Sequence, residues 1–195
     1  MKGTLFIFLL TLATMFSFSQ MTIKPGLGLN VTGMTVTNGT ATSKADGLVG
    51  ASIMFGERRF YFEPGIFWVW KSSHVTGNNS TTSEDFSTSL GGVRIPVTIG
   101  YHLPLSVGSK IGLRVFTGVS DFFITNTSAD VSQLDINKSN WSWHAGAGID
   151  IYRFYLDASY EWCLTSLQSA SQATNGIQLG KTHTLYIVVG FNIRL

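Results

Sequence analysis

The sequence predicts an all-β fold, an eight-stranded antiparallel up-and-down transmembrane β-barrel. Apolar and polar residues alternate with period two along most of the chain that follows an apolar N-terminal segment, which is typical of strands with two different faces. Long and short connections between these strands alternate, as they do in outer-membrane barrels. Tryptophan residues gather on the apolar face near the long connections, where a membrane boundary would place them.

Composition excludes several other classes of protein. Of 195 residues only 24 are charged, 13 basic and 11 acidic, which is 12% where a soluble domain carries about 25%. Apolar residues make up 44% of the chain, which is enough apolar surface for a folded protein to bury, so the composition is not that of a disordered chain. A formal net charge of +2 is too small for a nucleic-acid-binding surface. The single cysteine, Cys163, excludes a disulfide within the chain, and its polar parity predicts a buried thiol.

The N-terminus has the pattern of a cleaved targeting segment. Met1 to Thr4 gives a short positive start, Leu5 to Phe16 is apolar, and Ser17-Phe18-Ser19 puts small residues where signal peptidase reads them. About a dozen apolar residues are too few for a membrane-spanning helix, which needs about 20. The sequence therefore predicts a signal peptide over residues 1–19 and an outer-membrane β-barrel domain over residues 20–195.

Eight segments carry the strand pattern. Ile23, Leu27 and Val31 share one parity, for example, whereas Lys24 and Asn30 occupy the other. About ten residues per strand, tilted near 45°, span an apolar band about 25 Å tall. The predicted strands run over Ile23 to Val31, Val49 to Phe55, Phe60 to Trp70, Val93 to Leu103, Ile111 to Val119, Trp141 to Ile151, Phe154 to Leu164 and His183 to Leu195.

The connections predict which end of the barrel faces out of the cell. Outer-membrane barrels have short periplasmic turns and long extracellular loops. One of the three short connections is a tight turn at Tyr152-Arg153. Four connections are long, rich in Ser, Thr, Asn and Gly, and expected to be mobile: Gly33 to Asp46, Lys71 to Ser87, Asp121 to Asn140 and Thr165 to Lys181.

Aromatic residues favour a lipid-facing outer surface. A soluble lipocalin-like barrel would show the same alternation with its apolar residues inward. Indole rings prefer the boundary between headgroups and hydrocarbon, so a ring of tryptophans on the apolar parity indicates a membrane. The predicted ring contains Trp68, Trp70, Trp141, Trp143 and Trp162, and a second ring at the short-turn end contains Phe55, Phe60, Tyr101, Phe154 and Phe191.

The opposite parity carries charges of both signs, which predicts a salt-bridged plug. The interior of an eight-stranded barrel is only wide enough for side chains to fill, and a lone buried charge is costly. We therefore expect these residues to pair with one another and to leave no pore. They are Lys24, Glu63, Arg94, Arg114, His144, Asp150, Asp157, Glu161 and Arg194.

Two prolines lie within predicted strands. Pro64 and Pro96 lack the N–H that a strand in a closed barrel donates to its neighbour. Each is expected to mark a bulge or a bend.

The sequence resembles the PorT-like outer-membrane β-barrel family. Ile95-Pro96-Val97-Thr98-Ile99-Gly100-Tyr101, followed by Gly112-Leu113-Arg114-Val115-Phe116-Thr117-Gly118, is similar to the central hairpin of that family. Ala145 to Asp150 and the ending Leu185 to Leu195 also fit its pattern, so the resemblance spans nearly the whole mature chain. It implies an outer-membrane barrel, and one type of member assists a secretion and gliding apparatus.

One constellation suggests chemistry. A turn at Tyr152-Arg153 places His144 opposite Glu161, with Ser142 on the same face, which resembles a Ser-His-acid set. These side chains point inward, however, away from lipid substrates, and a His-Glu pair also satisfies a buried polar lumen. We expect no catalytic site, no cofactor and no enzyme activity. We also expect no metal site, because the histidines share no close spacing: His74, His102, His144 and His183.

Three functions remain open at this stage. The first is a structural or surface-interaction protein in the outer membrane that meets partners through its long loops. The second is an accessory barrel of a secretion or envelope-assembly machine, and the third is a lipid-modifying enzyme. The expected partners are outer-membrane lipid and proteins that bind the loops, without nucleic acid, and the expected state is a monomer.

Overall fold

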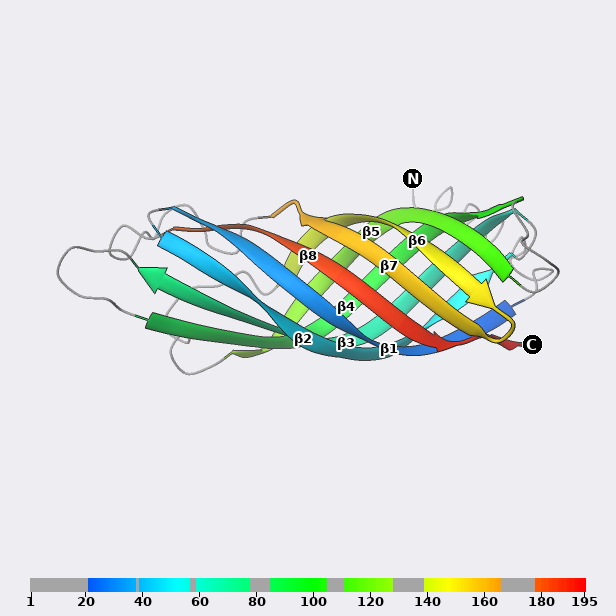
Figure 1. The fold of residues 1–195 in the computed structure, drawn as a ribbon, viewed down its shortest axis with the longest axis horizontal. Coiled ribbons are helices and arrows are strands. Elements are labelled where there is room, and N and C mark those ends of the chain that lie inside the picture. The colour runs from blue at the N-terminus through cyan, green and yellow to red at the C-terminus, as the bar shows by residue number, and fades with distance from the viewer. Residues whose placement is uncertain are drawn as a thin grey trace, which may run out of the picture.

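The computed structural model describes residues 21–37, 39–56, 59–77, 85–104, 111–127, 139–165 and 178–195. The predicted signal peptide, residues 1–19, lies outside these ranges. The strands of the described residues are shown in Figure 1. They are β1 (Met21–Thr37), β2 (Gly39–Phe55), β3 (Phe60–Gly77), β4 (Asp85–Leu103), β5 (Ile111–Thr127), β6 (Ser139–Ile151), β7 (Phe154–Cys163), β8 (Gln178–Phe191) and β9 (Ile193–Arg194).

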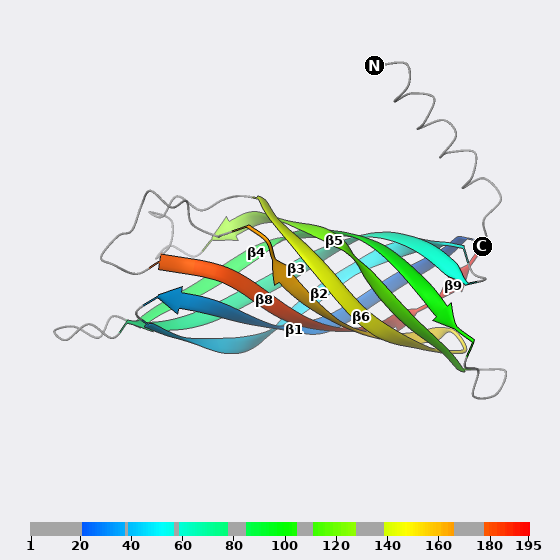
Figure 2. The same ribbon diagram turned by 90° about the horizontal axis from the view of Figure 1, so that it is seen from above.

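The strands close into a barrel. From β1 to β8 each strand pairs antiparallel with the next, and β8 returns to pair with β1. The short β9 continues β8, since Ile23↔Ile193 and Gly26↔Gly190 belong to the same register. The predicted eight-stranded antiparallel barrel is therefore confirmed, and Figures 1 and 2 show its strands running obliquely around one long axis. No helix among the described residues is long and apolar enough to cross a membrane.

The two faces of the wall follow the predicted parity. Leu27 and Leu29 are 62% and 61% exposed on the outside of β1, whereas Lys24 and Asn30 are fully buried on its inside. The same alternation holds along β6 and β7. A continuous apolar surface thus faces outward, and polar side chains fill the interior.

The strands are longer than predicted. β1 to β5 have 17 to 19 residues each, against the expected ten or so. Most of the segment predicted as a loop from Gly33 to Asp46 is paired strand, and the same holds for Lys71 to Gly77 and Asp121 to Thr127. The prediction failed because a polar composition indicates exposure to water, whereas threonine- and valine-containing polar segments still form antiparallel ladders.

Prolines interrupt the ladder without shifting it. Pro64 pairs with Val97 and Phe67 pairs with Arg94 in one register, so no residue is inserted between them. Of the bulge or bend predicted at Pro64 and Pro96, the bulge is therefore wrong. The missing N–H removes hydrogen bonds at each proline. No residue is inserted into either paired strand, however, so the pairing has the same register before and after the proline.

Register shifts occur instead toward the end of the barrel that carries the long connections. They lie between Met34 and Val36, between Ser43 and Leu48, and between Gly91 and Gly92. We call this the long-connection end. The opposite, short-connection end carries the β2–β3, β4–β5 and β6–β7 connections together with the start of β1 and β9.

The tight turn between β6 and β7 is confirmed. Ile151 pairs with Phe154, which leaves Tyr152 and Arg153 as a two-residue connection. Tyr152 has φ 57°, in the left-handed region that two-residue hairpins require. This turn sets the register of the hairpin that carries His144 and Glu161.

All five tryptophans project from the outer face, as predicted. They form two groups, one on β3 and one on β6 and β7, which are separated by β4 and β5 on one side of the barrel and by β8, β1 and β2 on the other. In the first group the ring centroids of Trp68 and Trp70 are 6.4 Å apart, and in the second Trp143 stacks on Trp162 at 4.7 Å. Near the short-connection end the outer aromatic contacts are Phe55–Phe62, Phe60–Tyr101 and Phe154–Phe191.

The outer face gives a depth-dependent stability prediction. Ile187 lies on β8 midway between His183, which pairs with Trp162, and Phe191, which pairs with Phe154, and it is 44% exposed. Ile187→Arg should lower the free energy of unfolding by roughly 2–4 kcal/mol, because it places a charge near the bilayer midplane. Urea titration of the barrel refolded into lipid vesicles measures this change.

Ile193→Arg is the matched control. Ile193 lies on the same outer face but at the short-connection end, where an arginine should cost only about 0–1 kcal/mol. Equal losses for the two variants would contradict a lipid-facing surface.

Candidate functional site: the charged lumen

The lumen is filled by polar side chains that closure of the barrel brings together. Inward positions on six strands contribute charged groups that are buried or nearly so. An eight-stranded barrel has room for such side chains only if they satisfy one another. They form two clusters, which we call the lower cluster, toward the short-connection end, and the upper cluster, toward the long-connection end.

The lower cluster contains two cations and three carboxylates. Lys24 Nζ lies 3.0 Å from Glu63 Oε1 and 3.2 Å from Asp157 Oδ2. Arg114 Nη2 lies 2.8 Å from the other Asp157 oxygen, and its Nε lies 2.6 Å from Asp150 Oδ2. These contacts join β1, β3, β5, β6 and β7 across the interior.

Aromatic rings line the lower cluster. Lys24 Nζ lies 4.4 Å from the centroid of the Tyr155 ring, and the Arg114 guanidinium lies 5.7 Å from that of Tyr61. Both tyrosines are buried on the luminal parity. These tyrosines were not among the residues predicted to fill the lumen, although they share the inward parity of the charged residues.

The upper cluster contains two cations and one carboxylate. Arg94 Nε lies 2.7 Å from Glu161 Oε2, and Lys71 Nζ lies 3.7 Å from Oε1. Ser120 donates a hydrogen bond of 2.6 Å to Glu161, and the Tyr186 hydroxyl donates another of 3.3 Å. Both oxygen atoms of the Glu161 carboxylate therefore have a hydrogen-bond or ion-pair partner.

Lys71 corrects a prediction. The sequence assigned it to a long loop, but it lies on the luminal side of β3, with its ammonium 4.4 Å from the Phe122 ring centroid. Asp46 and Asp121 also lie in strands instead of loops: Asp46 accepts hydrogen bonds from the backbone N–H and the hydroxyl of Ser72, and Asp121 from Ser139. Lys71 has the same parity as Val69 in the sequence, and this pattern could have predicted its luminal position.

The charges of the two clusters balance. The lower cluster has one more carboxylate than cation and the upper cluster has one more cation than carboxylate, so the four cations and four carboxylates sum to zero. A cavity of about 60 Å³ lies between them, lined by Glu63, Arg94, His144 and Asp157 among others. The predicted salt-bridged plug is thus present in the described residues.

The Ser-His-acid arrangement does not form. His144 does pair with Glu161 in the backbone register, as predicted, but its Nε2 lies 3.0 Å from Thr98 Oγ1 and its Nδ1 has no hydrogen-bond partner among the described residues. Glu161 is held by Arg94, Ser120 and Tyr186 instead. Ser142 lies opposite Cys163, whose buried thiol lies 3.0 Å from the Thr165 carbonyl oxygen.

Other sequence-predicted residues have separate places. Arg194 is exposed in β9 at the short-connection end. His183 is on the outer face, stacked on Tyr160 at 6.0 Å, and His102 lies beside Tyr61 at 5.1 Å. Among the described residues, no three His, Cys, Asp or Glu side chains are placed so that they could hold a metal ion together.

An apolar cluster also lies inside the barrel. Leu48, Phe67, Val69, Phe122 and Tyr186 are buried together, with Ile124 and Val188 against them. The alternation pattern treats apolar inward residues as exceptions, so the sequence did not predict this group. It packs beside the upper cluster and reduces the dielectric around the Glu161 ion pairs.

Sequence comparison identifies the family. A model of the outer membrane protein beta-barrel domain matches residues 6–169, most of the chain. The protein belongs to this family. It is an outer-membrane protein, and lipid surrounds the apolar outer face of the barrel.

Comparison with solved structures finds outer-membrane barrels that are similar to this chain at low sequence identity. The chain is similar to Ail, the attachment invasion locus protein of Yersinia pestis, with 11% identity and a TM-score of 0.47, over 90% of this chain and 99% of Ail. It is also similar to the N-terminal β-barrel domain of Pseudomonas aeruginosa OprF, with 15% identity and a TM-score of 0.43, over 86% and 97% of the two chains. A comparison with curated proteins finds no match.

The charge imbalance of the clusters gives a stability prediction. Glu161→Gln removes the only carboxylate of the upper cluster and leaves Arg94 and Lys71 facing each other without a counter-charge. The free energy of unfolding should fall by roughly 3–5 kcal/mol, as expected when one partner of a buried ion pair is removed. Urea titration in lipid vesicles measures the loss.

Glu63→Gln makes the same chemical change in the lower cluster. Asp150 and Asp157 remain there to pair with Lys24 and Arg114, so the loss should be clearly smaller. A larger loss for Glu63→Gln than for Glu161→Gln would contradict the assignment of net charge to the clusters.

Proposed function

We propose that this outer-membrane barrel is a non-conducting scaffold that presents the strand pairs of its long-connection end to partners outside the cell. The observation that carries the proposal is the filled lumen, in which balanced ion pairs and an apolar cluster occupy the interior. A barrel without a luminal path acts through its ends and its surface. The β2–β3 and β3–β4 ladders extend farthest at the long-connection end, to Gly39↔Gly77 and Thr76↔Asp85.

The orientation of the barrel is part of this proposal. Both β1 and β9 begin or end at the short-connection end, and long connections are extracellular in barrels of this type. We therefore assign the short-connection end to the periplasm. The partner is a surface macromolecule or protein bound through polar groups, and the barrel acts as a monomer without enzyme activity.

An accessory role in a secretion or envelope-assembly machine is the second candidate. It is supported by the PorT-like pattern of Ile95 to Tyr101 and Gly112 to Gly118, which pair with each other in the β4–β5 hairpin. A lipid-modifying activity has less support, because His144 is bonded to Thr98 and faces the lumen instead of the lipid.

Absence of conduction is the first expected outcome. The refolded protein should show no sustained porin-like current in planar bilayers, because side chains fill the interior of an eight-stranded barrel. Glu161→Gln should also fail to open a stable channel, since the apolar cluster remains in place. Stable currents of porin size from the unaltered protein would contradict the scaffold role.

Removal of the tip between β3 and β4 tests the interaction surface. Thr76 pairs with Asp85, so an Asn-Gly turn between them should close a shortened hairpin and leave the barrel folded. Binding of whole cells to the protein's partners should then fall, while heat-modifiable migration on gels remains. The matched control replaces Tyr152-Arg153 by Asn-Gly at the opposite end, which should leave binding intact.

The same pair of variants separates the two leading candidates. Loss of function from the altered Tyr152-Arg153 turn, with full function after shortening of the β3–β4 hairpin, would transfer the role to the short-connection end. That outcome would favour the machine-accessory function.

A further inference from the structure

His144 is a buried titratable side chain that belongs to neither charged cluster. It is 2% exposed on the luminal side of β6. Its Nε2 lies 3.0 Å from Thr98 Oγ1, whereas its Nδ1 has no hydrogen-bond partner among the described residues. When the Nε2–H donates to Thr98, Nδ1 carries a lone pair that can accept a proton. The scaffold role does not account for this unpaired nitrogen.

The His144 ring lines the cavity of about 60 Å³ between the two clusters. One water molecule needs on the order of 10–15 Å³ of such volume and about two to four polar partners. The cavity therefore has room for a few water molecules, and its lining supplies hydroxyl and carboxylate groups. They include Ser52, Glu63, Thr98, Asp157 and Ser159. Water in this space gives a proton a route to the imidazole.

Titratable side chains from three other strands face this part of the lumen. They are Glu63 of β3, Arg94 of β4, and Tyr155, Asp157 and Glu161 of β7. On β5 the ring packs against Gly118, where an added Cβ would lie 3.0 Å from His144 Cε1. Arg114, which also projects from β5, is held by carboxylates of the lower cluster. Each of the three listed carboxylates already has a cation partner in its own cluster, so an imidazolium would lack a carboxylate of its own.

A proton on His144 would break the charge balance of the lumen. The four cations and four carboxylates of the two clusters sum to zero, so an imidazolium makes five cations against four carboxylates. His144 lies opposite Glu161 of the upper cluster, which already has one more cation than carboxylate. Uncompensated charge is costly in a dry interior but is stabilised by water. A proton on this ring therefore favours a lumen that has opened to water.

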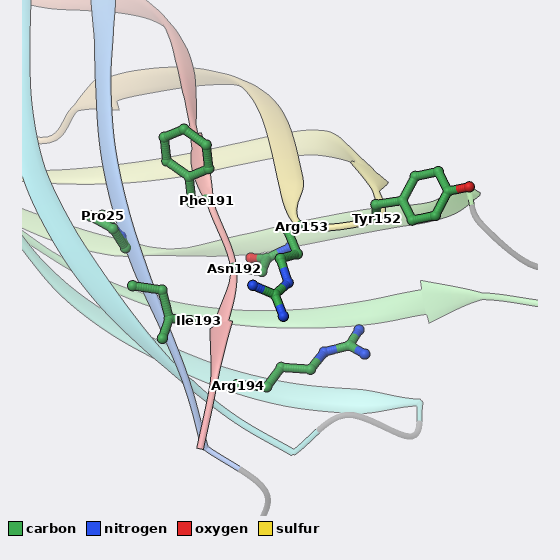
Figure 3. A pocket seen from close by; sticks show the side chains of 7 residues that line it. All are labelled: Pro25, Tyr152, Arg153, Phe191, Asn192, Ile193 and Arg194. Atoms are coloured by element: carbon green, nitrogen blue, oxygen red, sulfur yellow. The ribbon is translucent and has the colours of Figure 1, made fainter.

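The cleft in the barrel wall at the short-connection end has a different chemistry. It is lined by the Tyr152-Arg153 turn, by Phe191 to Arg194 at the junction of β8 and β9, and by Pro25 on β1 (Figure 3). This lining contains no histidine and no carboxylate, so its charge stays the same between pH 7.5 and pH 5.5. A response of the barrel to mild acid is therefore expected in the lumen and not in this cleft.

We propose that the barrel conducts small ions at acid pH, because its lumen opens to water when His144 takes up one proton. At neutral pH the imidazole is unprotonated and the lumen stays filled, as the scaffold role requires. An imidazole in water titrates near pH 6.5, so proton uptake by the open state alone raises the ratio of open to closed barrels on the order of tenfold between pH 7.5 and pH 5.5. The apolar cluster remains beside the upper cluster, so the openings are brief and smaller than those of a porin.

Current through the unaltered protein is the first test. The refolded barrel is recorded in planar bilayers at pH 7.5 and at pH 5.5, with the same salt on both sides. The fraction of time that the barrel spends in a conducting state should rise about tenfold at the lower pH. No rise, or no current at pH 5.5, would overturn the proposal.

Removal of the imidazole is the second test. His144→Gln keeps an amide that can bond to Thr98 but stays neutral at both pH values, so acid should no longer increase the current. His183→Gln is the matched control, because His183 is exposed on the outer face and stacks on Tyr160. Heat-modifiable migration on gels verifies that both variants fold. An acid response that His144→Gln retains, or that His183→Gln removes, would also contradict the proposal.

Discussion

The ion pairs that Lys24 and Arg114 make with carboxylates from three other strands hold the inner wall of this barrel together. Arg114 alone contacts Glu63, Asp150 and Asp157, which belong to β3, β6 and β7. Such contacts are possible because eight strands close around a space that only side chains can fill. Every charged group in that space needs a partner, and this requirement determines the contents of the lumen.

Closure also determines how the backbone tolerates proline. A closed barrel has no free edge, so a missing N–H must leave a gap in some ladder. Pro64 and Pro96 leave gaps within continuous registers, and the barrel keeps its pairing on both sides. Pro25 behaves in the same way, because Gly26↔Gly190 and Ile23↔Ile193 on either side of it belong to one register.

The two ends of the barrel therefore differ in their strand pairing and in their side chains. At the long-connection end, polar ladders extend well beyond the charged lumen and carry all the register shifts. At the short-connection end, a two-residue turn, the junction of β8 and β9 and an outer aromatic pair surround a cleft in the wall. The balanced lumen between them separates these ends from each other.

Local patterns in the sequence predict the number of strands, the face on which their residues lie and one register, because each follows from alternation or from a turn of defined length, whereas the strand ends were predicted too short. The position of His144 opposite Glu161 follows from the Tyr152-Arg153 turn and holds in the structure. The partners of these two side chains were decided only by tertiary structure. Arg94 on β4 and Ser120 on β5 reach Glu161 across the lumen, and Thr98 reaches His144. Strand parity fixes the face on which a side chain lies, but contacts across a lumen depend on how the tilted strands meet when the sheet closes.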